Sequence, residues 1–120
     1  MITLFGIPNC DTVKKARAWL TEHGVDYQFH DFKKQGIPQD RLNIWIAAAG
    51  WEKVLNRKGT TWRKLDPATQ ATAVNAESAA KLFILNVSLI KRPVVEWCDL
   101  PSKTDISVGF DAENWAKRLK

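Results

Sequence analysis

The first 32 residues show a β-α-β pattern of hydrophobic and polar positions. Residues 2–5 form a short apolar run that Gly6 and Pro8 end, as is typical of a buried strand. Residues 11–23 carry apolar side chains at helical spacing, and Gly24 can end that helix. Residues 25–30 then alternate, which predicts a strand with one solvent-facing side.

Residues 36–87 have a helical pattern throughout. Pro38 can occupy the first position of a helix that Gly50 ends. Asp66 followed by Pro67 is a typical helix start, and Asn75 can cap a third helix. The apolar faces of the first and third of these helices contain Leu42, Trp45, Ile46 and Ala49, and Ala76, Ala79, Ala80 and Phe83.

A strand pattern returns after Pro93. Residues 94–97 are rich in strand-forming side chains, a turn is expected at 99–103, and residues 106–110 alternate. Asp111 can cap a last helix, with Phe110 and Trp115 spaced as a hydrophobic staple. The order β-α-β, helical insertion at about 36–87, β-β-α predicts an α/β thioredoxin-like fold with a four-stranded mixed sheet, in a single domain over residues 1–120.

The composition and charge of the chain limit the kinds of partner that we expect it to bind. The net charge is +5 and the pI about 9.4, but basic and acidic residues are mixed along the chain, so we expect no nucleic-acid partner. A small anionic ligand explains the basic clusters equally well. No apolar run approaches the ~18 residues of a membrane span, and residues 1–10 do not resemble a signal peptide. We therefore expect a cytoplasmic protein with no membrane association, and a monomer, because no strand-edge motif requires a dimer.

The stretch GIPNCDTVKKAR, residues 6–17, carries the candidate chemistry. It places Cys10 at the start of a helix, whose N-terminus favours the thiolate, the nucleophilic form of cysteine. Lys14, one turn on, can add to this effect. A small buried hydrophobe is the alternative reading of Cys10, but a turn between Asn9 and Asp11 is a poor core position. The second cysteine of a C-x-x-C motif is absent, because Val13 stands there.

Cys98 is not expected to be the partner of Cys10. If Pro93 lies beside Cys10, Cys98 is five residues further along a strand, about 16 Å away at ~3.3 Å per residue. A disulfide needs Cα atoms within ~7 Å. We therefore expect Cys98 to be structural and an external thiol, glutathione, to resolve Cys10. The two histidines have no metal-ligand spacing, so no metal is expected.

Further cations could complete an anion site. Arg92, before Pro93, presents a fork suited to carboxylates and oxyanions, although a solvated surface arginine is the alternative. Residues 55–65, LNRKGTTWRKL, could form a glycine-hinged loop that closes an anion site, or equally a charged surface loop. Trp51 and Trp62 are expected in loops, where they could line a groove. Three further tryptophans are expected in the core, namely Trp19, Trp45 and Trp115.

Three stretches together, PNCDTVKKARAWL, GTTWRKL and IKRPVVE, resemble the arsenate reductase (ArsC)/Spx family over nearly the whole chain, and most closely its YffB-like branch. The resemblance implies a thioredoxin-like fold with a helical insertion and a cis peptide bond before Pro93. It also implies that Cys10 is the catalytic cysteine, and Arg92 matches the arginine before the family proline, so we expect both residues to be catalytic. Arsenate reductases of this family use glutathione and glutaredoxin, whereas YffB-like members are regarded as glutathione-dependent thiol reductases.

The sequence departs from the arsenate reductases at two of their three oxyanion-binding arginines. The second falls near Asn56, with Arg57 one position away, and the third falls at residues 108–110, which contain no arginine. We therefore expect a glutathione-dependent thiol reductase that acts on a disulfide or oxyanion substrate. The expected binding residues are Asn9, Asp11, Thr12, Val13, Arg57, Lys58, Arg92 and Pro93. The alternatives are an arsenate reductase and an Spx-like regulator that binds RNA polymerase.

Overall fold

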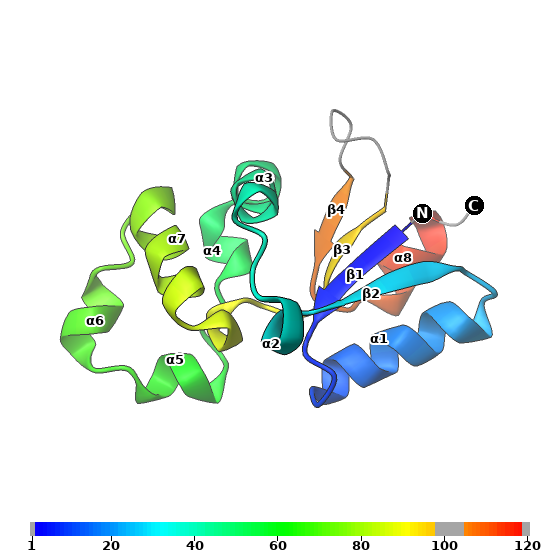
Figure 1. Ribbon diagram of the computed structural model, residues 1–120, viewed down its shortest axis with the longest axis horizontal. Helices are drawn as coiled ribbons and strands as arrows, with labels where there is room; N and C mark the ends of the chain where they lie inside the picture. The colour runs from blue at the N-terminus through cyan, green and yellow to red at the C-terminus, as the bar shows by residue number, and fades with distance from the viewer. Residues whose placement is uncertain (1, 98–104, 119–120) are drawn as a thin grey trace. The chain divides into compact units, whose positions relative to one another are not determined.

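The computed structural model describes residues 2–97 and 105–118 (Figure 1). The chain forms two units. The first unit comprises Met1–Phe32 and Arg92–Lys120, and the second comprises Lys33–Lys91. Within the described ranges, no helix is both long enough and apolar enough to span a bilayer.

The first unit contains a four-stranded mixed sheet in the order β2-β1-β3-β4. Its strands are β1 (Ile2–Gly6), β2 (Tyr27–Asp31), β3 (Val94–Glu96) and β4 (Ile106–Val108). β1 pairs in parallel with β2 and antiparallel with β3, which pairs antiparallel with β4. The predicted α/β fold and hairpin are thus confirmed, while the turn expected at 99–103 lies outside the described residues.

Helices α1 (Asp11–Glu22) and α8 (Ala112–Arg118) contribute to one core beneath the sheet (Figure 1). This core contains Leu4, Val13, Ala16, Leu20, Val95 and Trp115, none of them more than 1% exposed. The start of α8 is as predicted. The Asp111 carboxylate accepts a hydrogen bond from the Asn114 N–H at 3.2 Å. The rings of Phe110 and Trp115 meet edge to face, 4.8 Å between centroids, as the staple requires.

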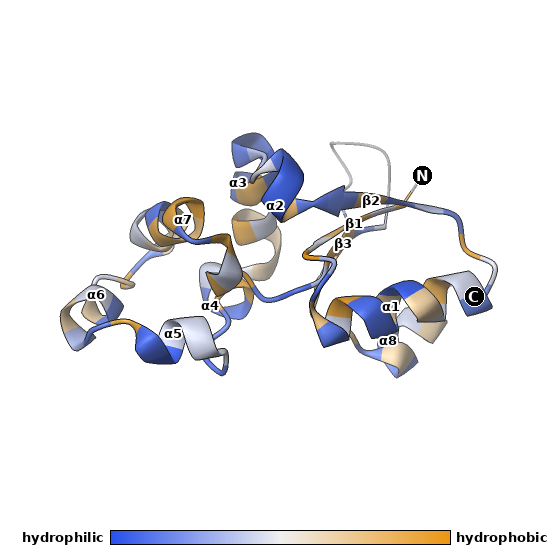
Figure 2. Cartoon of the chain, turned by 60° about the horizontal axis from the view of Figure 1, so that its bottom comes forward, coloured by the Kyte–Doolittle hydropathy of each residue, from blue (hydrophilic) through white to orange (hydrophobic). Residues whose placement is uncertain are grey.

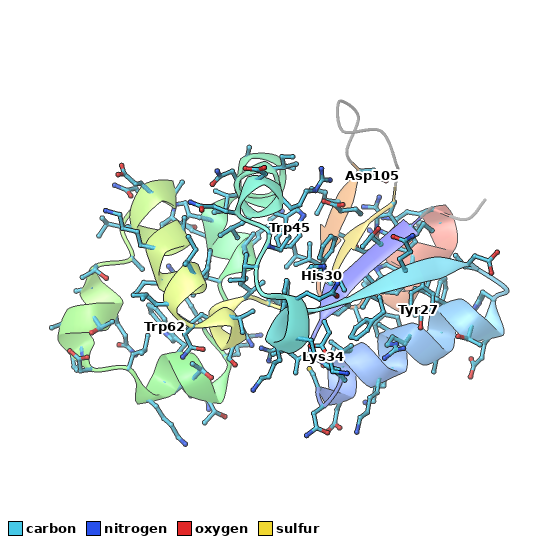
Figure 3. The ribbon with its side chains drawn as sticks, viewed as in Figure 1. Tyr27, His30, Lys34, Trp45, Trp62 and Asp105 are labelled. Carbon is cyan, nitrogen blue, oxygen red and sulfur yellow. The ribbon has the colours of Figure 1, made fainter. Side chains whose placement is uncertain are left out.

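The remaining helices follow β2. They are α2 (Phe32–Gln35), which begins at the last residue of the first unit, then α3 (Gln39–Ala49), α4 (Trp51–Val54), α5 (Thr60–Lys64), α6 (Pro67–Ala71), α7 (Ala76–Leu85) and the 3₁₀ turn η1 (Val87–Leu89). Within the second unit, Trp45, which Figure 3 labels, and Phe83 are fully buried, as the periodicity predicts. The helical segment expected between the second and third strands is therefore present.

Local capping signals account for the starts of α6 and α7. Asp66 caps α6 through the Thr69 N–H, and Asn75 forms a capping box with Ser78 at the start of α7. Pro38 differs from its prediction, since it is the N-cap of α3 and not its first helical residue. Its backbone is extended, and its carbonyl accepts the first helical hydrogen bond, 2.9 Å from the Leu42 N–H.

The stretch 55–65 is not the single loop that the sequence suggested. Gly59 is the N-cap of α5, and its carbonyl accepts from the Arg63 N–H at 3.3 Å. Trp51 and Trp62 were expected in loops, but they lie in α4 and α5. No residue of α5 is buried, so the hydrophobic pattern carried no helical signal there.

Candidate functional site

Cys10 is the N-cap residue of α1, reached from β1 by a tight turn. Its N–H donates to the Ile7 carbonyl at 3.2 Å, and its own carbonyl accepts from the Lys14 N–H at 2.9 Å. The thiol forms no capping hydrogen bond, so the N–H groups of the first helical turn are not taken up by this side chain. Cys10 is half-buried and packs at the border of the core beneath the sheet. This position gives the thiol both solvent access and an electropositive helix end.

Val13 occupies the place of a second cysteine and is part of the core. It is completely buried, and a Cβ atom added to Gly6 would lie 2.8 Å from its Cγ2 atom. The end of β1 therefore packs directly against the first turn of α1. Of the expected binding residues, Asn9, Asp11 and Thr12 are exposed, whereas Val13 can offer a ligand only its backbone.

The segment Arg92-Pro93 lies at the same end of the sheet as the turn before Cys10. Phe5 is opposite Val94 in the antiparallel register, so the chain after β1 and the chain before β3 come together there. The Arg92-Pro93 peptide bond is cis, as the family resemblance implied. Pro93 is buried, and Arg92 is half-buried with its Nε atom shielded from solvent.

Residues 108–110, where the arsenate reductases have their third oxyanion-binding arginine, have a structural role in this chain. Gly109 is buried, has a positive φ of 86°, and donates its N–H to the Pro93 carbonyl at 2.9 Å. Phe110 packs on Trp115. Residues 108–110 thus support the cis-proline segment and the last helix, and supply no cation.

The basic residues near Cys10 in sequence divide into two groups. Lys14 and Lys15 are exposed. Arg17 is instead held against β2, where its Nε donates to the Tyr27 hydroxyl at 3.0 Å and its guanidinium lies 4.1 Å from the centre of the Phe29 ring (Figure 3 labels Tyr27). Arg17 therefore belongs to the contact between α1 and the sheet.

Arg57 and Lys58 belong to the second unit and are both exposed. The Arg57 guanidinium lies 5.7 Å from the centre of the Trp51 ring, at the distance of a cation–π contact. Their use by a ligand bound at Cys10 stays a prediction, as does the role of Asn9.

Sequence reasoning missed one buried acid at this end of the sheet. Asp31 is only 8% exposed, and it pairs with Gly6 in the register of β1 and β2. Its position at the end of an alternating strand was visible in the sequence, but its burial was not. Cys98 lies outside the described residues. Within residues 2–97 and 105–118, no three His, Cys, Asp or Glu side chains gather as metal ligands would.

The chain is similar to several known proteins. A solved structure of a protein called YffB is 45% identical, with a TM-score of 0.90 and all of both chains covered. A solution structure of an arsenate reductase (ArsC) related protein from Brucella melitensis is 43% identical, with a TM-score of 0.73, covering 99% of this chain and 94% of that one. The global transcriptional regulator Spx of Streptococcus pyogenes serotype M3 is 31% identical over 97 residues, which are 79% of this chain and 71% of the regulator.

The match to the family as a whole extends over almost the entire sequence. Residues 5–118 match the ArsC family, a span that includes Cys10, the cis Arg92-Pro93 bond and all four strands apart from the first residues of β1. The chain belongs to the ArsC family.

Proposed function

We propose that this protein is a glutathione-dependent thiol reductase in which Cys10 is the only nucleophile. The observation that carries the proposal is the pairing of a half-buried thiol at the N-cap of α1 with a completely buried valine at the second-cysteine position. The Cys10 thiol can attack a disulfide. Val13 cannot resolve the product, and Cys98 is expected too far along the chain to do so, so we propose that a thiol from outside the chain is needed.

The proposed reaction has two exchange steps. The Cys10 thiolate attacks the glutathione sulfur of a glutathionylated substrate, forming the Cys10–glutathione disulfide and releasing the substrate thiolate. A second glutathione thiolate then attacks that mixed disulfide, which restores the Cys10 thiolate and releases oxidised glutathione. Glutaredoxin is a second candidate for this last step.

The backbone N–H groups of Asp11, Thr12 and Val13 would stabilise the thiolate in this scheme, because they precede the first intrahelical hydrogen bond of α1. Arg92 would bind a carboxylate of glutathione, since its guanidinium presents paired donors and the segment lies at the same end of the sheet. Arg57 or Lys58 is proposed as an additional cation for the same ligand. The reaction requires a compartment rich in reduced glutathione, such as the cytoplasm.

Reduction of a glutathionylated peptide tests the proposal. With glutathione as reductant, we expect turnover from the natural chain and from a Cys98→Ser variant, and none from Cys10→Ser. Arg92→Met should raise the KM for glutathione about tenfold, the value of one charge-assisted contact. Full activity of Cys10→Ser would overturn the proposal. An inactive natural chain in this assay would do the same.

Likeness to Spx supports a second candidate, a regulator that binds RNA polymerase. Retention of RNA polymerase on the immobilised protein, equal for the natural chain and Cys10→Ser, would favour it. Arsenate reduction has less support, because Gly109 and its neighbours supply no cation. Formation of arsenite from arsenate, with glutathione and glutaredoxin present, would favour arsenate reduction as the function.

A further inference from the structure

The exposed large hydrophobic residues among those the structure describes gather on and beside α7. They are Val74, Ile84 and Leu85, which are 68%, 48% and 83% exposed. Val74 directly precedes the Asn75 cap of α7, and the other two residues end the helix. Figure 2 shows hydrophobic colour over much of α7, although the buried side of the helix already accounts for Ala79 and Phe83. The outer face of α7 thus carries apolar side chains that nothing within the second unit covers.

Val74 and Ile84, but not Leu85, belong to a stripe of exposed side chains that has two charges, Glu77 and Lys81, at its centre. Within α7, Glu77, Lys81 and Ile84 follow one another at intervals of four and three residues, which is the spacing of the contact positions in a coiled coil, and Val74 lies just before the Asn75 cap, outside the helix. Glu77 and Lys81 are exposed, and neither makes an ion pair within the described part of the chain.

A groove of about 570 Å³ runs beside this stripe, between α3 and α7. Its lining includes three alanines, Ala47, Ala76 and Ala80, together with Ile46 and Ile84. Small side chains of this kind allow another helix to approach closely. Glu77 and Lys81 also line the groove, so the charges of the stripe lie at its border.

The stripe is complementary to itself when two copies run antiparallel. Placing Glu77 of one copy opposite Lys81 of the other, about a two-fold axis, brings Ile84 of each copy to the N-terminal end of α7 of the other, where Val74 precedes the cap. Both charges are then paired, and the exposed apolar side chains lie at the two ends of the same contact. A two-fold interface requires this self-complementarity. We propose that α7 is the contact surface of a homodimer, with the helix of the second copy lying antiparallel along the α3–α7 groove.

The proposed dimer is expected to be weak. A contact made mainly by one ten-residue helix from each copy is smaller than the ~1,600 Å² of a standard stable interface. Association should therefore appear only as a concentration-dependent equilibrium. The expectation of a monomer was based on the sheet edges, and the stripe on α7 is a different surface.

Charge exchange at Glu77 and Lys81 tests the register. Sedimentation velocity from about 1 μM to about 1 mM should show dimerisation of the natural chain. Glu77→Lys alone and Lys81→Glu alone should each weaken self-association about tenfold, since two attractive pairs become repulsive. The double variant should regain association. A mixture of the two single variants should form a heterodimer, because two acidic side chains on one copy then meet two basic ones on the other.

Lys64→Glu is the matched control, with the same charge change on α5 at an exposed position off the stripe. Thermal unfolding of all variants should be nearly unchanged, since surface substitutions have small effects on stability. The proposal is overturned by any of three results. The natural chain could sediment as a monomer throughout, the mixed single variants could fail to associate, or Lys64→Glu could weaken association as much as Lys81→Glu.

Discussion

Gly6 and Val13 approach so closely that no other residue fits at position 6 without displacement. A Cβ atom at Gly6 would lie 2.8 Å from the Val13 Cγ2 and 3.3 Å from its Cγ1. Both contacts are with a branched, completely buried side chain that cannot rotate away. The contact fixes the end of β1 against the first turn of α1, and so fixes the turn that carries Cys10.

Gly6→Ala is therefore expected to destabilise the fold. Overpacking of this kind costs about 1–3 kcal/mol of unfolding free energy, which urea denaturation can measure. Val13→Ala should also destabilise, through a cavity. The double variant should lose clearly less unfolding free energy than the two single variants lose in sum. The smaller side chain at position 13 leaves room for the added Cβ atom at position 6, which in turn fills part of the cavity. Additive losses would show that the two residues do not compete for the same space.

Val13→Cys restores the C-x-x-C spacing and tests the single-cysteine mechanism. The first turn of a helix brings residues at this spacing within disulfide range. Treated with oxidised glutathione, the natural chain should carry one glutathione on Cys10 by intact-mass spectrometry, whereas Val13→Cys should form an internal disulfide and carry none. Val13→Ala, which changes position 13 without adding a thiol there, is the control and should carry one glutathione as the natural chain does. Glutathione retained on Val13→Cys would show that the two positions cannot pair.

Arg17 and Lys14 lie on one helix but should have separable effects. Arg17→Met removes the hydrogen bond to Tyr27 and the contact with the Phe29 ring, so we expect a loss of about 1–2 kcal/mol in unfolding free energy. The KM for glutathione should not change. Lys14→Met should leave stability unchanged and slow the alkylation of Cys10 roughly twofold, as the loss of one exposed charge would. A raised KM in Arg17→Met would place that arginine at the ligand instead.

The cap of α6 gives a pH-dependent prediction. Hydrogen bonds from the Thr69 hydroxyl, at 2.6 Å, and from its N–H, at 3.2 Å, hold the pKa of Asp66 below its usual value of 3.8. A carboxyl whose pKa is lower in the folded than in the unfolded state stabilises the folded state at pH values above its unfolded-state pKa. This stabilisation is lost as the pH falls through the folded-state pKa.

Thr69→Val removes the hydroxyl, the larger cause of the shift, and keeps the N–H. The pKa of Asp66, followed by carboxyl NMR titration, should then rise toward 3.8. Thr72→Val is the control, because the Thr72 hydroxyl donates to the Thr69 carbonyl and not to the carboxylate. An unchanged titration in Thr69→Val would assign the shift to the backbone alone.

Local signals in the sequence were sufficient to predict most of the helices and strands. Asp66, Asn75 and Asp111 cap helices as predicted, because a cap depends only on the few residues that follow it. The order of strands and helices also indicated the fold, and three short motifs indicated the family. Helix α5 was missed, since it is short and buries nothing.

Tertiary structure decided what surrounds Cys10. Strand register, a property of distant pairings, brought the turn before Cys10 and the cis Arg92-Pro93 bond to one end of the sheet. The same pairings buried Asp31 and directed Arg17 to the sheet. The sequence by itself determined where a reactive thiol could stand, because a helix start is local. Which side chains accompany that thiol depended on packing between segments far apart in the chain, and no local pattern encodes such packing.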